Sequence, residues 1–209
     1  VLDMALTTGG DFSELFMEDT ESNNISMNDG SVETATYSRI KGAGIRVLKG
    51  TKCAYAYTSD TREEALMETA RAAAAAIDGL KEGETREFSV RDYKKIPELP
   101  FSSIDNKTRV ELLKKGTAAA RAYSDEVSCV TARYLDVDQR IMVCNSLGVW
   151  AEDRRPRTRI FVQAIASKDG EAQTGYESPG LGMGFKAYEI IDAEKVGERA
   201  AKTAVTMLH

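Results

Sequence analysis

The chain has 209 residues, of which 42% are hydrophobic and 29% are charged, and it contains only 4 prolines. This composition is enough for one sizeable core or two small cores that share a sheet, and it excludes collagen-like, coiled-coil and long disordered chains. The 28 Lys and Arg residues against 33 Asp and Glu residues leave a formal charge of −5, so the clustered basic excess that a general nucleic-acid surface needs is not expected.

The first half of the chain predicts a meander of antiparallel strands followed by one helix. Asp29-Gly30 and Lys49-Gly50 are turn signals between alternating segments. The predicted strands are Phe12–Thr20, Ile25–Met27, Val32–Ile40, Ile45–Leu48 and Cys53–Tyr57, with a bend at Gly42 and Gly44.

The helix is predicted over Thr61–Leu80, with Asp60 or Thr61 as its cap and Gly79 and Gly83 as stop signals. Its apolar residues recur every three or four positions and predict one buried stripe. These residues are Leu66, Ala70, Ala73, Ile77 and Leu80.

The second half predicts the same kinds of element after a polar connection over Glu82–Ser103, which we expect to cross the surface. One helix is predicted over Asp105–Tyr123, and another begins near Asp192. The first should turn Val110, Leu113, Ala120 and Tyr123 inward, and the second Ala193, Val196, Ala200, Ala204 and Leu208. The strands between the helices are predicted over Val127–Val137, Arg140–Cys144, Val149–Ala166 and Glu171–Tyr176.

Matching residues of the two halves lie at nearly constant offsets. Gly30 and Gly148 are 118 positions apart, Gly50 and Gly170 are 120 apart, and Tyr57 and Tyr176 are 119 apart. Such a register favours an internal duplication, with repeats at about 1–80 and 105–209. The predicted fold class is therefore α+β, with duplicated antiparallel strand meanders each followed by a packing helix.

The two ends of the sequence predict a piece of a longer protein. Val1–Leu6 followed by Gly9-Gly10 is typical of the last turns of a helix and its cap. Thr206–His209 ends a helical pattern without a stop signal. No apolar run approaches the roughly 20 residues that cross a bilayer, and no charged-then-apolar leader opens the chain.

Residues that could carry chemistry are scarce. Cys53, Cys129 and Cys144 lack the CxxC spacing of metal or redox sites, so we expect buried, structural thiols in a reducing compartment. The sole histidine, His209, excludes an internal Ser-His-Asp triad and a zinc site with ordinary ligand spacing. We therefore predict no catalytic residue, no metal ligand and no cofactor in this chain, and the pattern identifies no substrate-binding residue.

The glycine-rich segment PGLGMGF does not form a nucleotide-binding motif. Gly180, Gly182 and Gly184 fail the third spacing of GxGxxG, and no strand directly precedes them. Two alternatives stay open for Pro179–Phe185, namely a mobile lid near a cleft or a flexible connection to the last helix.

Arginines and aromatic residues also allow two interpretations. Arg155, Arg157 and Arg159, preceded by Arg154, could share one strand face that binds acidic partners or nucleic acid, or they could form a solvated face paired with Glu152 and Asp153. We favour the solvated face. The alternation of Tyr55, Tyr57 and Tyr176 predicts half-buried sheet residues, and Trp150 is expected in the core or at a subunit interface.

Three segments together resemble the TldD/PmbA family, also known as proposed modulators of DNA gyrase. The first is the stretch from Asp11 that contains GAGIRVLKG and YAYT, which is its most specific part and is closer to TldD than to PmbA (TldE). The others are NSLGVWAEDRRPRTRIFVQAIASKDGEAQTGYES and the glycine-rich stretch before the last helix. The resemblance covers essentially the whole chain and identifies it as an N-terminal domain of this family.

The resemblance implies a cytoplasmic, zinc-dependent peptidase that acts on unstructured peptides and pairs TldD-type with TldE-type subunits. Its zinc ligands, an HExxxH helix and a distant cysteine, belong to a C-terminal domain, and none maps onto His209 or the three cysteines. This chain would be an inactive domain that helps frame the substrate cleft and takes part in subunit pairing or forms a homodimer. The alternative is a non-catalytic binding module, as a TldE-like subunit or a modulator of DNA gyrase. Membrane binding and nucleic-acid binding are not expected.

Overall fold

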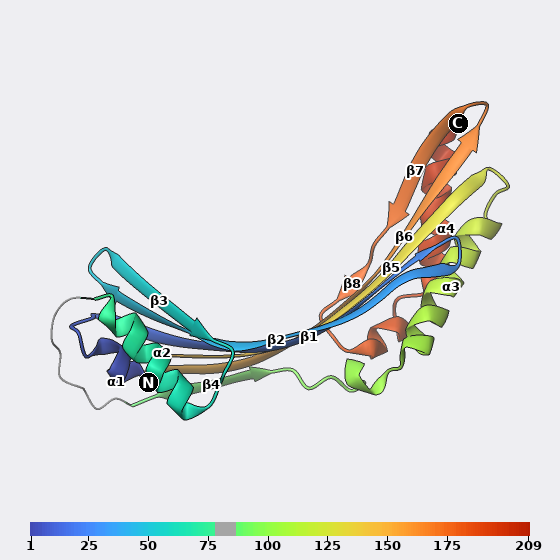
Figure 1. Ribbon diagram of the computed structural model, residues 1–209. Coiled ribbons are helices and arrows are strands. Elements are labelled where there is room, and N and C mark those ends of the chain that lie inside the picture. The colour runs from blue at the N-terminus through green and yellow to red at the C-terminus, as the bar shows by residue number, and fades with distance from the viewer. Residues whose placement is uncertain (78–86) are drawn as a thin grey trace. The chain divides into compact units, whose positions relative to one another are not determined.

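The structure, a computed structural model, describes residues 1–77 and 87–209 (Figure 1). Its strands form one sheet in which the order is β3-β2-β1-β5-β6-β4, and β7 and β8 also pair with β6. The strands described are β1 (Phe12–Asn28), β2 (Ser31–Lys49), β3 (Lys52–Thr58), β4 (Ser89–Lys94), β5 (Val127–Asn145), β6 (Val149–Lys168), β7 (Glu171–Glu177) and β8 (Gly180–Leu181). The helices described are α1 (Leu2–Leu6), α2 (Glu63–Ala75), α3 (Asn106–Ala122) and α4 (Ala193–Leu208). The predicted α+β class is confirmed.

Three strands are longer than the sequence predicts. β1, β2 and β5 run without interruption for 17, 19 and 19 residues, although breaks were predicted within each. β2 continues through Gly42 and Gly44, where the sequence predicts a bend between two separate strands. A Cβ added to Gly42 would lie 2.7 Å from the carbonyl oxygen of Thr58, so glycine permits a close approach of backbones at this point.

The predicted hairpin turns are confirmed. Asp29 and Gly30 both have positive φ angles, of 45° and 81°, and Asp169 and Gly170 have φ angles of 54° and 86°. Two successive positive φ angles twist a tight turn in the sense that matches the flanking strands. Aspartate and glycine adopt this backbone at low cost, which is why the sequence signal was strong at these two places.

Two of the three predicted helix starts are confirmed. The Asp105 carboxylate accepts a hydrogen bond from the Thr108 backbone N–H at the start of α3, and Asp192 does the same for two N–H groups of α4. The predicted cap of α2 is wrong, because Arg62 occupies the cap position and the Asp60 carboxylate binds the Arg62 side chain instead. The predicted end of this helix, with Leu80, Gly79 and Gly83, lies outside the described residues.

The connection between α2 and α3 contains a strand that the sequence did not predict. β4 pairs with β6 in parallel, from Ser89 opposite Val149 to Lys94 opposite Arg154. The predicted antiparallel hairpins β2–β3 and β6–β7 are present, and β4 adds a parallel pair to the sheet. All six β4 residues are exposed, so no alternation of apolar and polar residues marked the strand.

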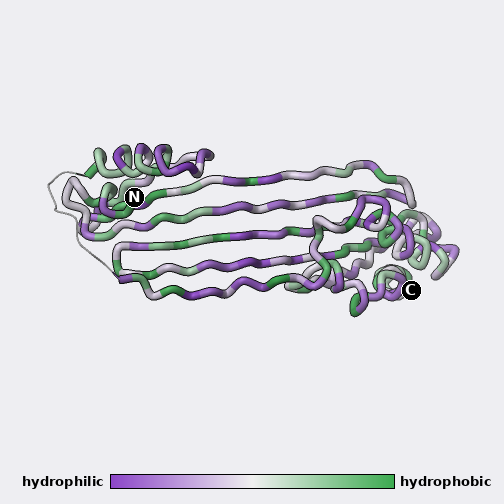
Figure 2. The backbone as a smooth tube through the Cα atoms, turned by 90° about the horizontal axis from the view of Figure 1, so that it is seen from below, coloured by the Kyte–Doolittle hydropathy of each residue, from purple (hydrophilic) through white to green (hydrophobic). Residues whose placement is uncertain are grey.

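The chain divides into two compact units, each made of three segments. Unit 1 comprises residues 1–20, 39–95 and 139–154, and unit 2 comprises residues 21–38, 96–138 and 155–209. The boundaries between these segments fall within β1, β2, β5 and β6, so each of these long strands contributes residues to both units. Hydrophobic and hydrophilic stretches are interleaved along these strands (Figure 2).

Unit 1 has a small apolar core under α1 and α2. Leu66, Ala70, Ala73 and Ile77 of the predicted stripe are buried, and Trp150 packs against this core in part, as predicted. The other buried members are Leu2, Ala5, Leu6, Leu15, Ala43, Ile45, Val47, Ala54 and Cys144.

Unit 2 has a larger core, in which α3 and α4 cover one face of its strands (Figure 1). The two helices touch through backbone, because a Cβ added to Gly197 would lie 2.0 Å from the Gly116 carbonyl oxygen. Tyr123, which was predicted to point inward, is 42% exposed because it lies past the last turn of α3. The other predicted inward residues of both helices pack against the buried strand residues, which are Ile25, Met27, Val127, Val130, Ala132, Tyr134, Ile160, Val162, Ala164 and Ala166.

Candidate functional site

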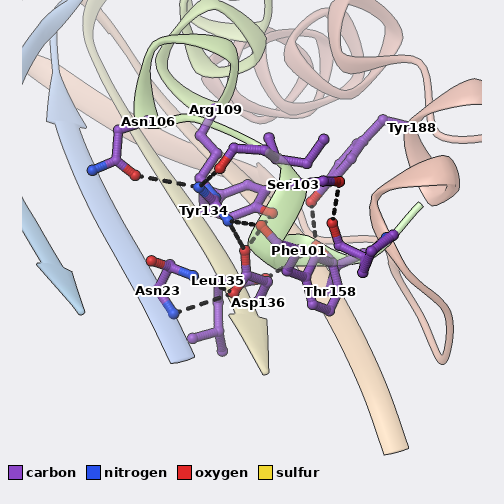
Figure 3. A network of polar contacts seen from close by, with 12 residues as sticks. Asn23, Phe101, Ser103, Asn106, Arg109, Tyr134, Leu135, Asp136, Thr158 and Tyr188 are labelled. Atoms are coloured by element: carbon purple, nitrogen blue, oxygen red, sulfur yellow. Dashed lines mark hydrogen bonds and ion pairs between the residues drawn. The ribbon is translucent and has the colours of Figure 1, made fainter. Parts of the chain in front are cut away.

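The most elaborate polar arrangement in unit 2 is a buried ion pair between α3 and β5. The Arg109 and Asp136 side chains are 4% and 1% exposed, and Arg109 Nη2 lies 3.0 Å from Asp136 Oδ2. Arg109 Nε donates to the same oxygen at 3.1 Å (Figure 3). A buried charge of this kind is tolerated only when its remaining hydrogen-bonding groups are also satisfied.

Backbone and side-chain groups satisfy the rest of the guanidinium. Arg109 Nη1 donates to the Ile104 carbonyl oxygen at 2.6 Å and to Asn106 Oδ1 at 3.3 Å, and Nη2 donates to the Phe101 carbonyl oxygen at 2.8 Å. These carbonyl groups belong to the 3₁₀ turn Phe101–Ser103 and the residue after it. Arg109 therefore fixes the segment that enters α3 to the first turns of that helix.

The Asp136 carboxylate is equally occupied. Tyr134 Oη donates to Asp136 Oδ2 at 2.8 Å, and the backbone N–H and side-chain Nδ2 of Asn23 donate to Oδ1 at 3.2 and 2.8 Å. Burial, followed by the charge of Asp136, raises the pKa of Tyr134 well above its ordinary value. Tyr134 therefore stays a hydrogen-bond donor at every ordinary pH.

A second contact joins β6 to the segment before α4. Thr158 Oγ1 donates to the Leu135 carbonyl oxygen at 3.1 Å and lies 2.7 Å from the Tyr188 hydroxyl (Figure 3). Burial also raises the pKa of Tyr188. The rings of Tyr134 and Tyr188 pack at 5.8 Å, so the two groups of contacts are continuous.

This network holds structure together and leaves no reactive group exposed. Among the described residues, every buried side-chain nitrogen and oxygen has a hydrogen-bond partner. The network was not predicted from the sequence, although β5 carries its signal. Tyr134, Asp136 and Asp138 continue the buried alternation of Val130 and Ala132, and an aspartate in such a position requires a buried partner.

The three cysteines lie in different environments. Cys144 is buried in the core of unit 1, where burial raises the pKa of its thiol, and Cys129 donates a weak hydrogen bond to Asn28 Oδ1. The prediction of three buried thiols is confirmed only for Cys144, because Cys129 is half-buried and Cys53 is exposed on β3, the last strand of the sheet order. Within the described ranges, no three His, Cys, Asp or Glu residues gather in a way that could hold a metal ion.

The histidine contacts a carboxylate. His209 Nε2 lies 3.0 Å from Glu126 Oε2, and Lys168 Nζ lies 3.0 Å from Glu126 Oε1. Hydrogen bonds from His209 and then from Lys168 hold the pKa of Glu126 below its ordinary value.

The arginines of β6 share one face, as predicted. Arg155, Arg157 and Arg159 are exposed, whereas Pro156 and Thr158 between them are buried. Glu152, proposed as one of their partners, instead binds Lys94 Nζ at 2.7 Å and accepts a hydrogen bond from Trp150 Nε1.

The tyrosines are not half-buried as predicted. Tyr55, Tyr57 and Tyr176 are 62%, 79% and 65% exposed. Tyr55 stacks on Tyr57, and Tyr176 stacks on Phe161, with ring centroids 6.3 and 6.0 Å apart. Alternation marked the strands correctly, but none of the described helices buries these rings.

The glycine-rich segment makes specific contacts. Gly180 and Leu181 form β8 against Arg159 and Thr158, and the Phe185 backbone N–H donates to the Leu99 carbonyl oxygen at 2.9 Å. A Cβ added to Gly184 would lie 2.3 Å from that carbonyl oxygen, which explains glycine at this position. No helix in the described part of the chain is long and apolar enough to cross a membrane.

The chain is an α+β protein in which one mixed sheet carries two helix-covered units. Comparison with protein families gives two matches. Residues 99–208 match the PmbA/TldA metallopeptidase central domain, and residues 13–77 match the PmbA/TldA metallopeptidase domain 1. The chain belongs to the PmbA/TldD metallopeptidase family.

Individual relatives agree with this assignment. The chain is 24% identical over 203 residues to a metalloprotease TldD homolog of Haemophilus influenzae, covering 93% of this chain and 42% of the relative. It is 25% identical over 207 residues to a metalloprotease of Methanothermobacter thermautotrophicus, covering 95% and 43%. The chain thus spans less than half the length of these relatives.

Solved structures share the fold. A proposed modulator of a DNA gyrase from Thermotoga maritima has a TM-score of 0.73 at 21% identity, covering 93% of this chain and 44% of that one. TldE from Thermococcus kodakarensis has a TM-score of 0.69 at 17% identity, covering 94% and 44%.

Proposed function

We propose that this chain is the non-catalytic N-terminal part of a TldD-like zinc metallopeptidase that degrades or processes unstructured peptides. It helps to frame the substrate and takes part in subunit pairing, in a cytoplasmic protein. Family membership over both matched stretches is the observation that carries the proposal. The names of the two metalloprotease relatives support the reaction class.

The residues of this chain do not fit the zinc ion of such an enzyme. Zinc binds thiolates, neutral imidazoles and carboxylates gathered at one point. Cys144 is buried with a raised pKa, which disfavours its thiolate, and the described residues contain no cluster of three ligand-type side chains. The proposal therefore assigns the metal, the polarised water and the general base to a C-terminal domain beyond this chain.

An uncovered strand edge supports the handling of extended peptides. β3 pairs with β2 only from Ala43 to Lys49, and residues 31–41 of β2 are exposed throughout. In unit 2, Ser31–Ser38 is rich in residues that favour strands and contains no lysine or proline to block pairing. An unstructured peptide can add to such an edge as a strand, whereas a folded protein already pairs its own backbone groups.

The same kind of edge supports pairing of subunits. A TldD-type or TldE-type partner, or a second copy of this chain, is the expected associate. Light scattering over a concentration series should show the chain's mass rising toward that of a dimer. A strictly monomeric chain at high micromolar concentration would place pairing outside this part of the protein.

The decisive experiment concerns the sequence that follows His209 in the gene. We expect the reading frame to encode HExxxH, and we expect the longer protein to cleave an unfolded peptide, to spare a folded protein and to lose activity when zinc is chelated. The 209-residue chain alone should cleave neither substrate. Equal cleavage of folded and unfolded substrates would contradict the proposal.

A second candidate is a non-catalytic subunit or protein-binding module. The fold shared with TldE of T. kodakarensis and with the proposed gyrase modulator of T. maritima favours it. A longer reading frame without HExxxH, in a protein that binds a catalytic partner, would select this candidate.

A further inference from the structure

The face of unit 2 that turns away from α3 and α4 is basic. At alternate positions of β5 and β6 this face carries four arginines and no acidic residue, whereas the whole chain has a charge of −5. The neighbouring alternate positions are buried in the core, which establishes which residues face outward. The outward positions are Cys129, Thr131, Arg133, Leu135, Val137, Arg155, Arg157, Arg159, Phe161, Gln163 and Ile165.

Among the described residues, two of these arginines have no carboxylate partner. Arg155 and Arg157 have other contacts within the chain. Arg133 and Arg159 form no ion pair with any residue of the ranges 1–77 and 87–209. The sequence-based interpretation, in which the arginines are paired with acidic residues at a solvated face, therefore does not account for Arg133 and Arg159.

A groove lies beside Arg159. Its volume is about 460 Å³, and its wall is formed by Arg157, Arg159 and the segment Gly180–Gly182. Leu135 and Val137 contribute an apolar floor, and Leu135 is 41% exposed. Glycine allows the wall to lie close, because a Cβ at Gly180 would be 2.9 Å from the Thr158 carbonyl oxygen.

We propose that this groove, together with Arg133, binds an extended acidic segment of a peptide. Carboxylates of the segment would pair with Arg159 and Arg133, and an apolar side chain between them would rest on Leu135 and Val137. The choice of a peptide as partner rests on the proposed function. Single-stranded nucleic acid fits less well, because aromatic platforms hold its bases and this floor is aliphatic.

Fluorescence anisotropy on the 209-residue chain tests the proposal without any cleavage step. The probe is a fluorescein-labelled peptide, Gly-Ser-Glu-Leu-Glu-Ser-Gly, and its matched control carries Gln in place of both Glu residues. We expect the Glu peptide to bind at least about five-fold more tightly, and we expect added salt to weaken this preference. Arg159→Gln and Arg133→Gln should each weaken binding of the Glu peptide several-fold. Arg199→Gln, which changes an arginine of α4 paired with Glu177 at 3.5 Å, should leave binding unchanged.

Three outcomes would overturn the proposal. The first is equal binding of the Glu and Gln peptides, and the second is unchanged binding by both arginine variants when their urea midpoints match the parent chain. The third is displacement of the peptide by a 12-nucleotide single strand that binds more tightly. Equal binding of the two peptides would refute only the proposal that this groove binds acidic peptides. The peptidase proposal is tested separately, by the cleavage activity of the longer protein.

Discussion

The two units both pack helices against strands, but they differ in the residues that they bury. Both place helices on one face of strands and leave the other face open. Unit 1 buries a small, mainly apolar set under α1 and α2, with the neutral hydroxyls of Ser13 and Thr69 beside it, and its ion pair between Arg46 and Glu14, at 2.9 Å, lies at the surface. Unit 2 buries an ion pair, and its helices cross at glycine. The difference indicates that a buried charge must be paired in unit 2, whereas the ion pair of unit 1 lies in solvent.

The largest expected effect is the difference in stability lost when the buried ion pair and the surface ion pair are each broken. Arg109→Met leaves Asp136 charged and buried without its partner, so we expect the free energy of unfolding to fall by about 3–5 kcal/mol. Arg46→Gln in unit 1 should cost less than about 1 kcal/mol, because its pair is exposed to solvent. Urea unfolding measures both variants. Equal costs would remove the distinction between the two interiors.

Removing a tyrosine hydroxyl should also cost more stability in the buried network of unit 2 than at the surface of unit 1. Tyr134→Phe removes a donor to a buried carboxylate and should cost about 1.5–3 kcal/mol. Tyr57→Phe removes a hydroxyl from an exposed ring, so its effect should lie within about 0.5 kcal/mol. Thermal unfolding of the two variants beside the parent chain checks this, and a neutral Tyr134→Phe would mean that the network is not needed for stability.

The helix crossing in unit 2 gives a third test. Gly197→Ala should destabilise the chain by about 1–3 kcal/mol, because the new methyl group meets the Gly116 carbonyl oxygen. This cost opposes the roughly 1 kcal/mol that alanine normally adds to a helix. Gly182→Ala, where a Cβ meets nothing within 4 Å, is the matched control and should be nearly neutral. A stabilised Gly197→Ala chain would show that the helices can separate without loss.

The smallest expected effect is the pH dependence that Asp60 of unit 1 gives to the free energy of unfolding in acid. Hydrogen bonds from Arg62 lower the pKa of Asp60 from its ordinary 3.8 to about 2. Because the folded pKa is depressed, the contribution of Asp60 is fully present above pH 3.8 and disappears as the pH falls through 2. The difference in unfolding free energy between the parent chain and Asp60→Asn should therefore be small and should vanish toward pH 2. A difference that grows as the pH falls would contradict the sign.

The local structure was predictable where one short signal decides it. Aspartate caps fixed the starts of α3 and α4, and Asp-Gly pairs fixed two hairpin turns, since each signal acts through its own backbone. β4 and the uninterrupted β1 were not predictable. An exposed edge strand carries no alternation, and polar residues in the middle of a ladder resemble a loop until their partner strand is known.

The candidate site was predictable only at its surface. The shared face of Arg155, Arg157 and Arg159 follows from strand alternation, so the sequence sufficed for it. The pairing of Arg109 with Asp136 joins residues 27 positions apart, and only tertiary structure brings them together. The exposure of Tyr55 and Tyr57 likewise depends on tertiary structure, because none of the described helices covers their face of β3.

The organisation of the units refines the proposed duplication, which remains a proposal. The β2–β3 and β6–β7 hairpins have the same register. Ala43 pairs with Thr58 in the first hairpin and Val162 pairs with Glu177 in the second, and each residue of the second pair lies 119 positions after its counterpart in the first. Yet neither unit is a contiguous half of the chain. Residues 21–38 of the first half belong to unit 2, and residues 139–154 of the second half belong to unit 1.

The central claim is that this chain handles extended peptides through its sheet, and hydrogen–deuterium exchange tests it most directly. The 209-residue chain would be measured with and without a saturating unfolded peptide. The account predicts slower exchange of backbone amides in Ser31–Ser38, while α2 and α4 stay unchanged. A bound peptide that leaves the amides of this edge unprotected would contradict it.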